Sequence, residues 1–132
     1  MGARELVAVL LGGAVGTALR LLIDMGVPPG DDQFPLSTLI VNSVGAFALG
    51  VLVVRVWPIA PDWVRAGLGA GLLGSFTTFS AIAVSLVSLA SMDQWMPTLG
   101  FLGLTLVFGF GAAALGLTLG RPMPTPTDMV DE

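Results

Sequence analysis

Residues 74–80 read GSFTTFS and place four hydroxyl side chains and two phenylalanines within a strongly apolar part of the chain. Thr38 and Asn42 lie four residues apart in another apolar part, so they share one face of a helix. Hydroxyl and amide groups donate and accept hydrogen bonds without carrying a charge at neutral pH. The chemistry that these residues offer is therefore hydrogen bonding, either between packed helices or along a path lined with polar groups.

Composition excludes most other chemistry. The chain of 132 residues contains no cysteine and no histidine, which rules out disulfides, zinc sites of the usual ligands, thiol nucleophiles and catalytic triads. We therefore expect that the protein is not an enzyme. The net charge of −4 comes mainly from loops and from the C-terminal end, and no basic segment predicts a nucleic-acid partner.

The elements that must position the polar residues are membrane spans. Hydrophobic residues make up 55% of the chain and charged residues 11%, whereas about a quarter of the residues in soluble domains are charged. A helix needs about 20 apolar residues to cross a bilayer. Four continuous apolar stretches are long enough: residues 6–23, 36–57, 64–90 and 96–120. Continuous rather than alternating hydrophobicity disfavours a β-barrel. We predict an all-α membrane protein with one four-helix domain over residues 1–121 and a short disordered tail over residues 122–132.

The third span is predicted to break near its centre. At about 1.5 Å per residue it would be about 40 Å long, more than the hydrocarbon thickness of about 30 Å. The hydroxyl residues of GSFTTFS and the preceding Gly67, Gly69 and Gly71 weaken a helix and offer competing hydrogen bonds.

Arginine placement predicts the orientation. With a cytoplasmic N-terminus, four arginines fall inside, and the outer loops hold only aspartates: the arginines are Arg4, Arg55, Arg65 and Arg121, and the aspartates are Asp24, Asp31, Asp32 and Asp93. Arg20, at the outer end of the first span, is either an interfacial anchor or a functional charge.

Several of these features have a purely structural interpretation. Thr38 and Asn42 can join helices by hydrogen bonds, and glycine pairs at four-residue spacing, among them Gly12 with Gly16, favour close helix packing. Ser85, Ser88 and Ser91 form a stripe that is either a packing face or a hydroxyl-lined path. No Asp, Glu or Lys lies inside the predicted spans, which argues against a proton-coupled small-molecule exporter.

Three blocks of sequence, taken together, resemble the CrcB/Fluc family of fluoride channels. They are GGAVGTALR at residues 12–20, TLIVNSVGAFALG at 38–50 and GLLGSFTTFSAI at 71–82. The resemblance implies an antiparallel dimer of four-helix subunits in the plasma membrane, with two narrow pores for passive fluoride efflux that lowers cytoplasmic fluoride toxicity. It also implies a structural sodium ion at the dimer interface, held by the backbone carbonyls of Gly74 and Thr77.

The resemblance implies pore roles for individual residues as well. Asn42 would donate its amide hydrogens to fluoride, Phe79 would present its ring edge, and Ser80 would begin a hydroxyl track. Thr38 would line or support the same face as Asn42. Arg20 would draw anions into a vestibule.

The chain also departs from the family pattern. Ala81 and Ile82 stand where the family often has Thr and Phe, and the chain has no tyrosine. An antiparallel homodimer also needs subunits that insert in both orientations, whereas the arginines here are strongly biased. Two interpretations stay open: a homodimer, or a heterodimer with an oppositely oriented paralogue in which this chain is a structural or partly degenerate subunit.

Overall fold

A computed structural model describes residues 2–28 and 34–121. Its helices are α1 (Ala3–Gly26), α2 (Leu36–Arg55), α3 (Asp62–Ala66), the π-helix η1 (Gly67–Leu73), α4 (Gly74–Phe76), α5 (Phe79–Ser91) and α6 (Trp95–Gly120). Within these described ranges, four stretches are long and apolar enough to cross a membrane: Ala3–Gly26, Leu36–Arg55, Asp62–Ser91 and Trp95–Gly120. The all-α fold with four spans and a broken third span is thereby confirmed. The predicted tail over residues 122–132 lies outside the described residues.

The first helix is longer than predicted at both ends. We expected Asp24 in an outer loop, but α1 continues to Gly26 and includes it. The expectation was wrong because hydropathy marks only the apolar part of a helix. One turn after Arg20, the Asp24 carboxylate forms an i, i+4 ion pair that is compatible with continued helix.

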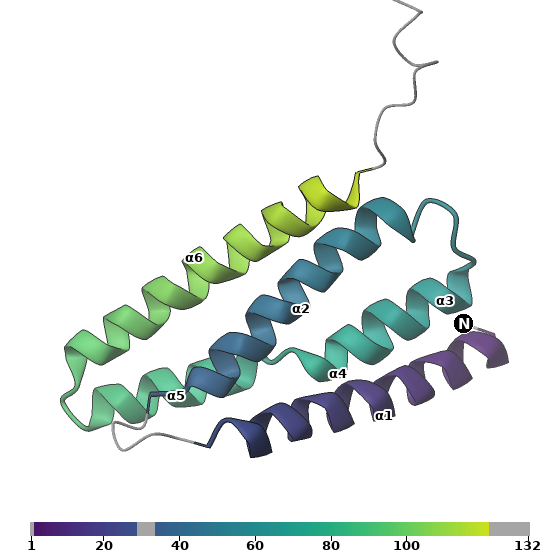
Figure 1. The fold of residues 1–132 in the computed structure, drawn as a ribbon. Helices are drawn as coiled ribbons and strands as arrows, with labels where there is room; N and C mark the ends of the chain where they lie inside the picture. Colours follow the sequence, from purple (N-terminus) through teal and green to yellow (C-terminus); the bar gives the residue numbers. More distant parts are fainter. Residues whose placement is uncertain (1, 29–33, 122–132) are drawn as a thin grey trace, which may run out of the picture.

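The arrangement brings the basic ends of the spans together. Figure 1 shows the N-terminus, the C-terminal ends of α2 and α6, and the start of α3 at one end of the molecule. There Arg55 Nε donates a hydrogen bond of 3.0 Å to the carbonyl of Gly120, the last residue of α6. A cation at a helix C-terminus also interacts favourably with the helix dipole. The cytoplasmic location of this end stays a prediction from the positive-inside rule.

Glycines let the helices approach closely. A Cβ on Gly16 of α1 would overlap the carbonyl oxygen of Leu72 in η1, and one on Gly116 of α6 would overlap that of Phe47 in α2. Such contacts between backbones replace the hydrophobic driving force that is absent between helices in lipid. The small-residue packing predicted for Gly12 and Gly16 is thus confirmed for α1 against η1.

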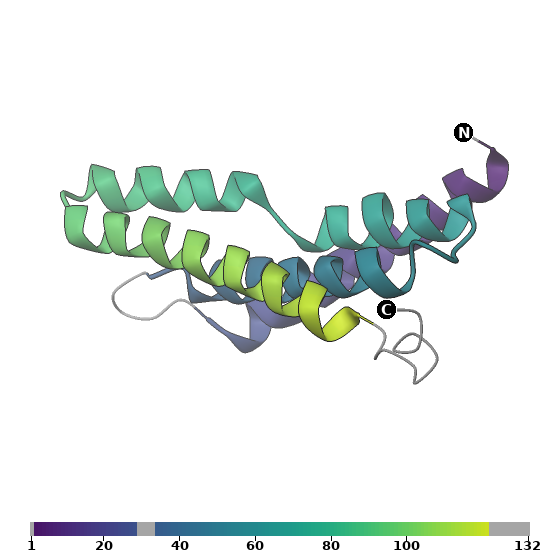
Figure 2. The ribbon, with the colours of Figure 1, turned by 90° about the horizontal axis from the view of Figure 1, so that it is seen from above.

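The third span is interrupted twice. Residues of η1 form a π-helix, a wider helix that often occurs at functional sites. The chain is then extended at Thr77 (φ −80°, ψ 159°) and Thr78 (φ −150°, ψ 122°) before α5 begins. Figure 2 shows this extended segment between α4 and α5. The predicted break is therefore confirmed, and it lies within the GSFTTFS sequence.

A small core holds α5 in place beyond the break. Leu39 of α2, Leu89 of α5 and Phe101 of α6 are buried together, and Ile82 packs against them. The Phe34 and Phe101 rings meet edge to face at 5.7 Å. The side chain at position 82 is therefore used inside this subunit.

Candidate functional site

The break in the third span releases backbone groups that a continuous helix would pair. Among the described residues, no hydrogen bond reaches the carbonyl oxygens of Gly74 and Thr77. The first turn of α5 points its N–H groups back toward the same region, where the Thr78 hydroxyl accepts from Ala81 N–H at 3.1 Å. The break thus places a helix C-terminus, which attracts cations, beside a helix N-terminus, which attracts anions.

Asn42 supplies the hydrogen bonds that the backbone lost at Thr78. Its Nδ2 donates to the Thr78 carbonyl at 3.0 Å, and its Oδ1 accepts from the Thr78 N–H at 2.8 Å. This two-way pairing fixes the orientation of the amide, because reversing it would face donor with donor and acceptor with acceptor. One Nδ2 hydrogen remains for another acceptor.

Two grooves meet at the break. The first, which we call the α1 groove, has a volume of about 600 Å³ and is lined by α1 together with the break and the start of α5. The second, the α2 groove, has a volume of about 560 Å³ and is lined by α2, α3, η1 and the break. Gly74 and Thr77 line both grooves.

The structure distributes the predicted site residues between these grooves. Arg20, Phe79 and Ser80 line the α1 groove, and Asn42 lines the α2 groove. Thr38, one turn before Asn42 on α2, is half-buried and lines neither groove. Six of the seven predicted residues therefore gather around the break, counting Gly74 and Thr77.

The two phenylalanines of GSFTTFS have different environments. Phe76 is buried inside the subunit, whereas the Phe79 side chain is 84% exposed at the edge of the α1 groove. Beside Phe79, the Ser80 hydroxyl lies 3.1 Å from that of Thr78. Only Phe79 can therefore present its ring to an ion in this groove.

The oxygen donors at the break are of the kind that hard cations prefer. The described residues contain no group of three or more carboxylates that could hold a metal. The Gly74 and Thr77 carbonyls are neutral oxygens for which no hydrogen bond is found among the described residues, a kind of donor that suits hard cations better than soft ones. Two oxygens do not complete a coordination shell, so a cation held by Gly74 and Thr77 would need further ligands from a second copy or from water.

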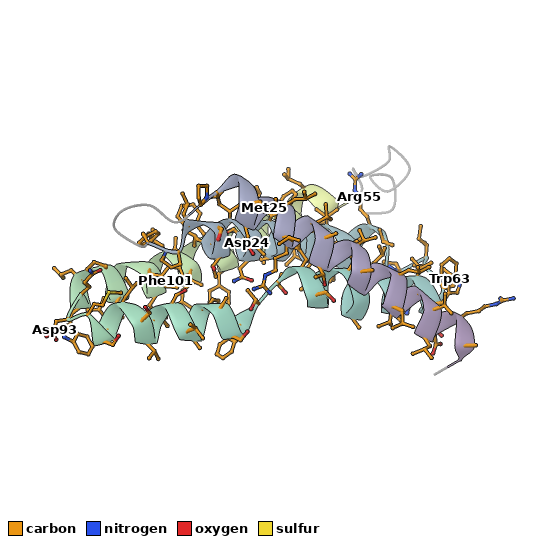
Figure 3. All side chains as sticks on the ribbon, turned by 90° about the horizontal axis from the view of Figure 1, so that it is seen from below. Asp24, Met25, Arg55, Trp63, Asp93 and Phe101 are labelled. Atoms are coloured by element: carbon orange, nitrogen blue, oxygen red, sulfur yellow. The ribbon has the colours of Figure 1, made fainter. Side chains whose placement is uncertain are left out.

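Sequence reasoning missed two features of the site. The Asn42–Thr78 pairing joins residues 36 positions apart, and no local pattern indicates it. Asp24 lines the α1 groove with its carboxylate Oδ2 3.8 Å from Arg20 Nε, and Figure 3 shows it on α1 at the level of the break. The i, i+4 spacing of Arg20 and Asp24 could have indicated this pair if α1 had been extended by one turn.

Comparison with known proteins supplies an independent classification. Residues 7–117 match the model of a family described as CrcB-like protein, Camphor Resistance. The chain is 38% identical over 123 residues to a fluoride-specific ion channel, FluC 2, of Halalkalibacterium halodurans, covering 92% of this chain and 90% of that protein. It is 35% identical to the fluoride-specific ion channel FluC of a Hydrogenobaculum species (86% and 94% covered), and 39% identical to FluC 2 of Parasynechococcus marenigrum (92% and 85% covered).

Proposed function

Because the chain belongs to the CrcB family, a family of ion channels and not of enzymes, we propose that it is a subunit of a fluoride-selective channel that gives passive fluoride efflux and lowers cytoplasmic fluoride toxicity. The observation that carries this proposal is the break in the third span, which places Phe79 and Ser80 in the α1 groove and Asn42 in the α2 groove, with Gly74 and Thr77 lining both. Fluoride holds its hydration shell tightly, so a selective path must replace water with neutral donors. The free Nδ2 hydrogen of Asn42, the Ser80 hydroxyl and the edge of the exposed Phe79 ring are donors of that kind.

The arrangement of the grooves suggests the route. The proposed route runs along the α1 groove, which Arg20, Ser80 and Phe79 line, and crosses the break at Thr77 to the α2 groove with Asn42. No side chain on this route needs to gain or lose a proton, which fits passive conduction and not proton-coupled export. Thr38 then supports the α2 face from outside the route.

A structural sodium ion is part of the proposal. The Gly74 and Thr77 carbonyls would hold it, and two oppositely oriented subunits would supply four such oxygens. The cation would neutralise helix C-termini that lipid cannot solvate. This ion stabilises the assembly and is not transported.

A heterodimer is the second candidate. Ile82 packs into the subunit's own core. Arg55 and Arg65 belong to helix ends that lie at one end of the molecule, whereas Arg20 lies beside the break, and this bias favours a single insertion orientation. Some relatives carry the name FluC 2, a number that distinguishes them from another protein of that name. An oppositely oriented paralogue would then complete the dimer and contribute the better-equipped pore.

Fluoride efflux from liposomes that contain only this protein tests both candidates. We expect a fluoride electrode to record rapid efflux after a potassium ionophore is added, with no comparable chloride efflux. Fluoride efflux by the chain alone would rule out an obligate heterodimer. Absence of efflux, both alone and after coexpression with a paralogue, would refute the proposed function.

A further inference from the structure

The α1 groove contains a charge that works against an anion path. Of its described lining residues, Arg20 and Asp24 are the charged ones. Arg20 Nε and Asp24 Oδ2 are 3.8 Å apart, which is within ion-pair range and beyond hydrogen-bond length. The groove therefore carries no net side-chain charge where an entering anion would benefit from a positive one.

Both charges remain accessible to ions in the groove. The side chains of Arg20 and Asp24 are 34% and 42% exposed, so neither is buried by the other. An exposed pair of this kind contributes little to stability. Its main effect is on the local potential, because a carboxylate 3.8 Å from the guanidinium cancels most of the field that Arg20 would produce farther away.

We propose that Asp24 is a residue that limits conduction: by pairing with Arg20 it keeps the α1 groove electrically neutral and slows the entry of anions. This inference rests on the proposed function. Removing the negative charge leaves Arg20 to attract fluoride, and an unscreened positive charge at the mouth of a narrow path raises the local anion concentration. Asp24 thus limits the rate at which anions enter the α1 groove without contacting the fluoride that passes Asn42.

Asp24→Asn tests this role against a matched control, Asp93→Asn. Asp93 lies in the turn between α5 and α6, outside the α1 groove, and has φ 58°, a conformation that asparagine tolerates well. Both substitutions remove one negative charge from the side that the arginine pattern predicts to be outer. At an ionic strength of about 0.01 M, where the Debye length is about 30 Å, we expect Asp24→Asn to raise fluoride efflux on the order of 10-fold and Asp93→Asn to leave it unchanged. At about 1 M, with a Debye length of about 3 Å, the difference should largely disappear.

Two results would overturn the inference. Equal efflux in Asp24→Asn and Asp93→Asn would show that the carboxylate does not affect entry, and lower efflux in Asp24→Asn would show that it positions Arg20. Arg20→Gln should lower efflux, and the Arg20→Gln, Asp24→Asn double variant should return close to the wild-type value.

A second measurement reports the electrostatic potential in the α1 groove and does not depend on fluoride efflux. The chain has no cysteine, so Thr17→Cys introduces a single thiol in the α1 groove. The ratio of its reaction rates with an anionic and a cationic thiosulfonate reagent measures the local potential. We expect Asp24→Asn to raise this ratio severalfold. An unchanged ratio would refute the proposal that Asp24 keeps the α1 groove electrically neutral. Absence of fluoride efflux in every variant, both alone and after coexpression with a paralogue, together with a raised ratio would refute the proposed function instead.

Discussion

Asn42→Ala removes both hydrogen bonds that hold the break. The bonds to the Thr78 carbonyl and N–H are 3.0 and 2.8 Å long, and Thr78 is only 9% exposed. Each bond contributes about 1 kcal/mol net, and each buried backbone group left without a partner costs about 1–3 kcal/mol, whereas hydrogen bonds in a membrane protein average about 0.6 kcal/mol. We expect a loss of about 2–4 kcal/mol in the free energy of unfolding.

The neighbouring variant Ser43→Ala is the control. The Ser43 hydroxyl donates to the Leu39 carbonyl of its own helix at 2.7 Å, so its loss leaves no other group unpaired. Unfolding in mixed micelles, followed by tryptophan fluorescence, should place Ser43→Ala within about 0.5 kcal/mol of the wild type. If Asn42→Ala were equally mild, the pairing would not hold the break, and the argument for the site geometry would fail.

Asn42→Asp separates structure from conduction. The carboxylate can still accept from the Thr78 N–H, but it cannot donate to the Thr78 carbonyl, and its charge repels fluoride. We expect it to abolish fluoride efflux even in samples selected for correct assembly by size-exclusion chromatography. Unaltered efflux would count against Asn42 as a pore residue.

Two further predictions concern the residues that hold the break and the proposed cation. Gly45→Ala should reduce fluoride efflux at least 10-fold, because the new Cβ would overlap the Thr77 methyl, and rotating Thr77 would break its 2.8 Å hydrogen bond to the Leu73 carbonyl. The control is Gly109→Ala, whose Cβ meets nothing within 4 Å in the subunit. Equal efflux in the two variants would refute the packing argument. Replacing sodium by a large organic cation should weaken the dimer, which the rate of subunit exchange between labelled copies would report. An exchange rate independent of sodium would refute the proposed sodium ion.

The number and the approximate limits of the spans follow from the sequence because hydropathy and helix length are local properties. The excess length of the third span also indicated the break, since a straight helix of that size does not fit the bilayer. The C-terminal end of α1 did not follow, because a charged pair such as Arg20 and Asp24 is compatible with helix beyond the apolar part.

The arrangement of the site was less predictable. Phe76 and Phe79 are three residues apart and chemically alike, yet one is buried and the other exposed, because the chain changes direction between them. The two grooves are lined by segments far apart in the sequence, which no local pattern in a single sequence brings together. Family resemblance assigned roles to Asn42 and Phe79, but it did not indicate that Asn42 also pairs with the backbone of Thr78.

The pairing of Asn42 with the backbone of Thr78 affects how positions 42 and 78 vary in evolution. Both hydrogen bonds between Asn42 and residue 78 go to main-chain atoms, and every amino acid except proline presents the same N–H and carbonyl groups there. A substitution at 78 therefore demands no compensating substitution at 42. Two residues in direct contact would leave no correlated trace in aligned sequences, and the constraint would appear only as an asparagine that does not change.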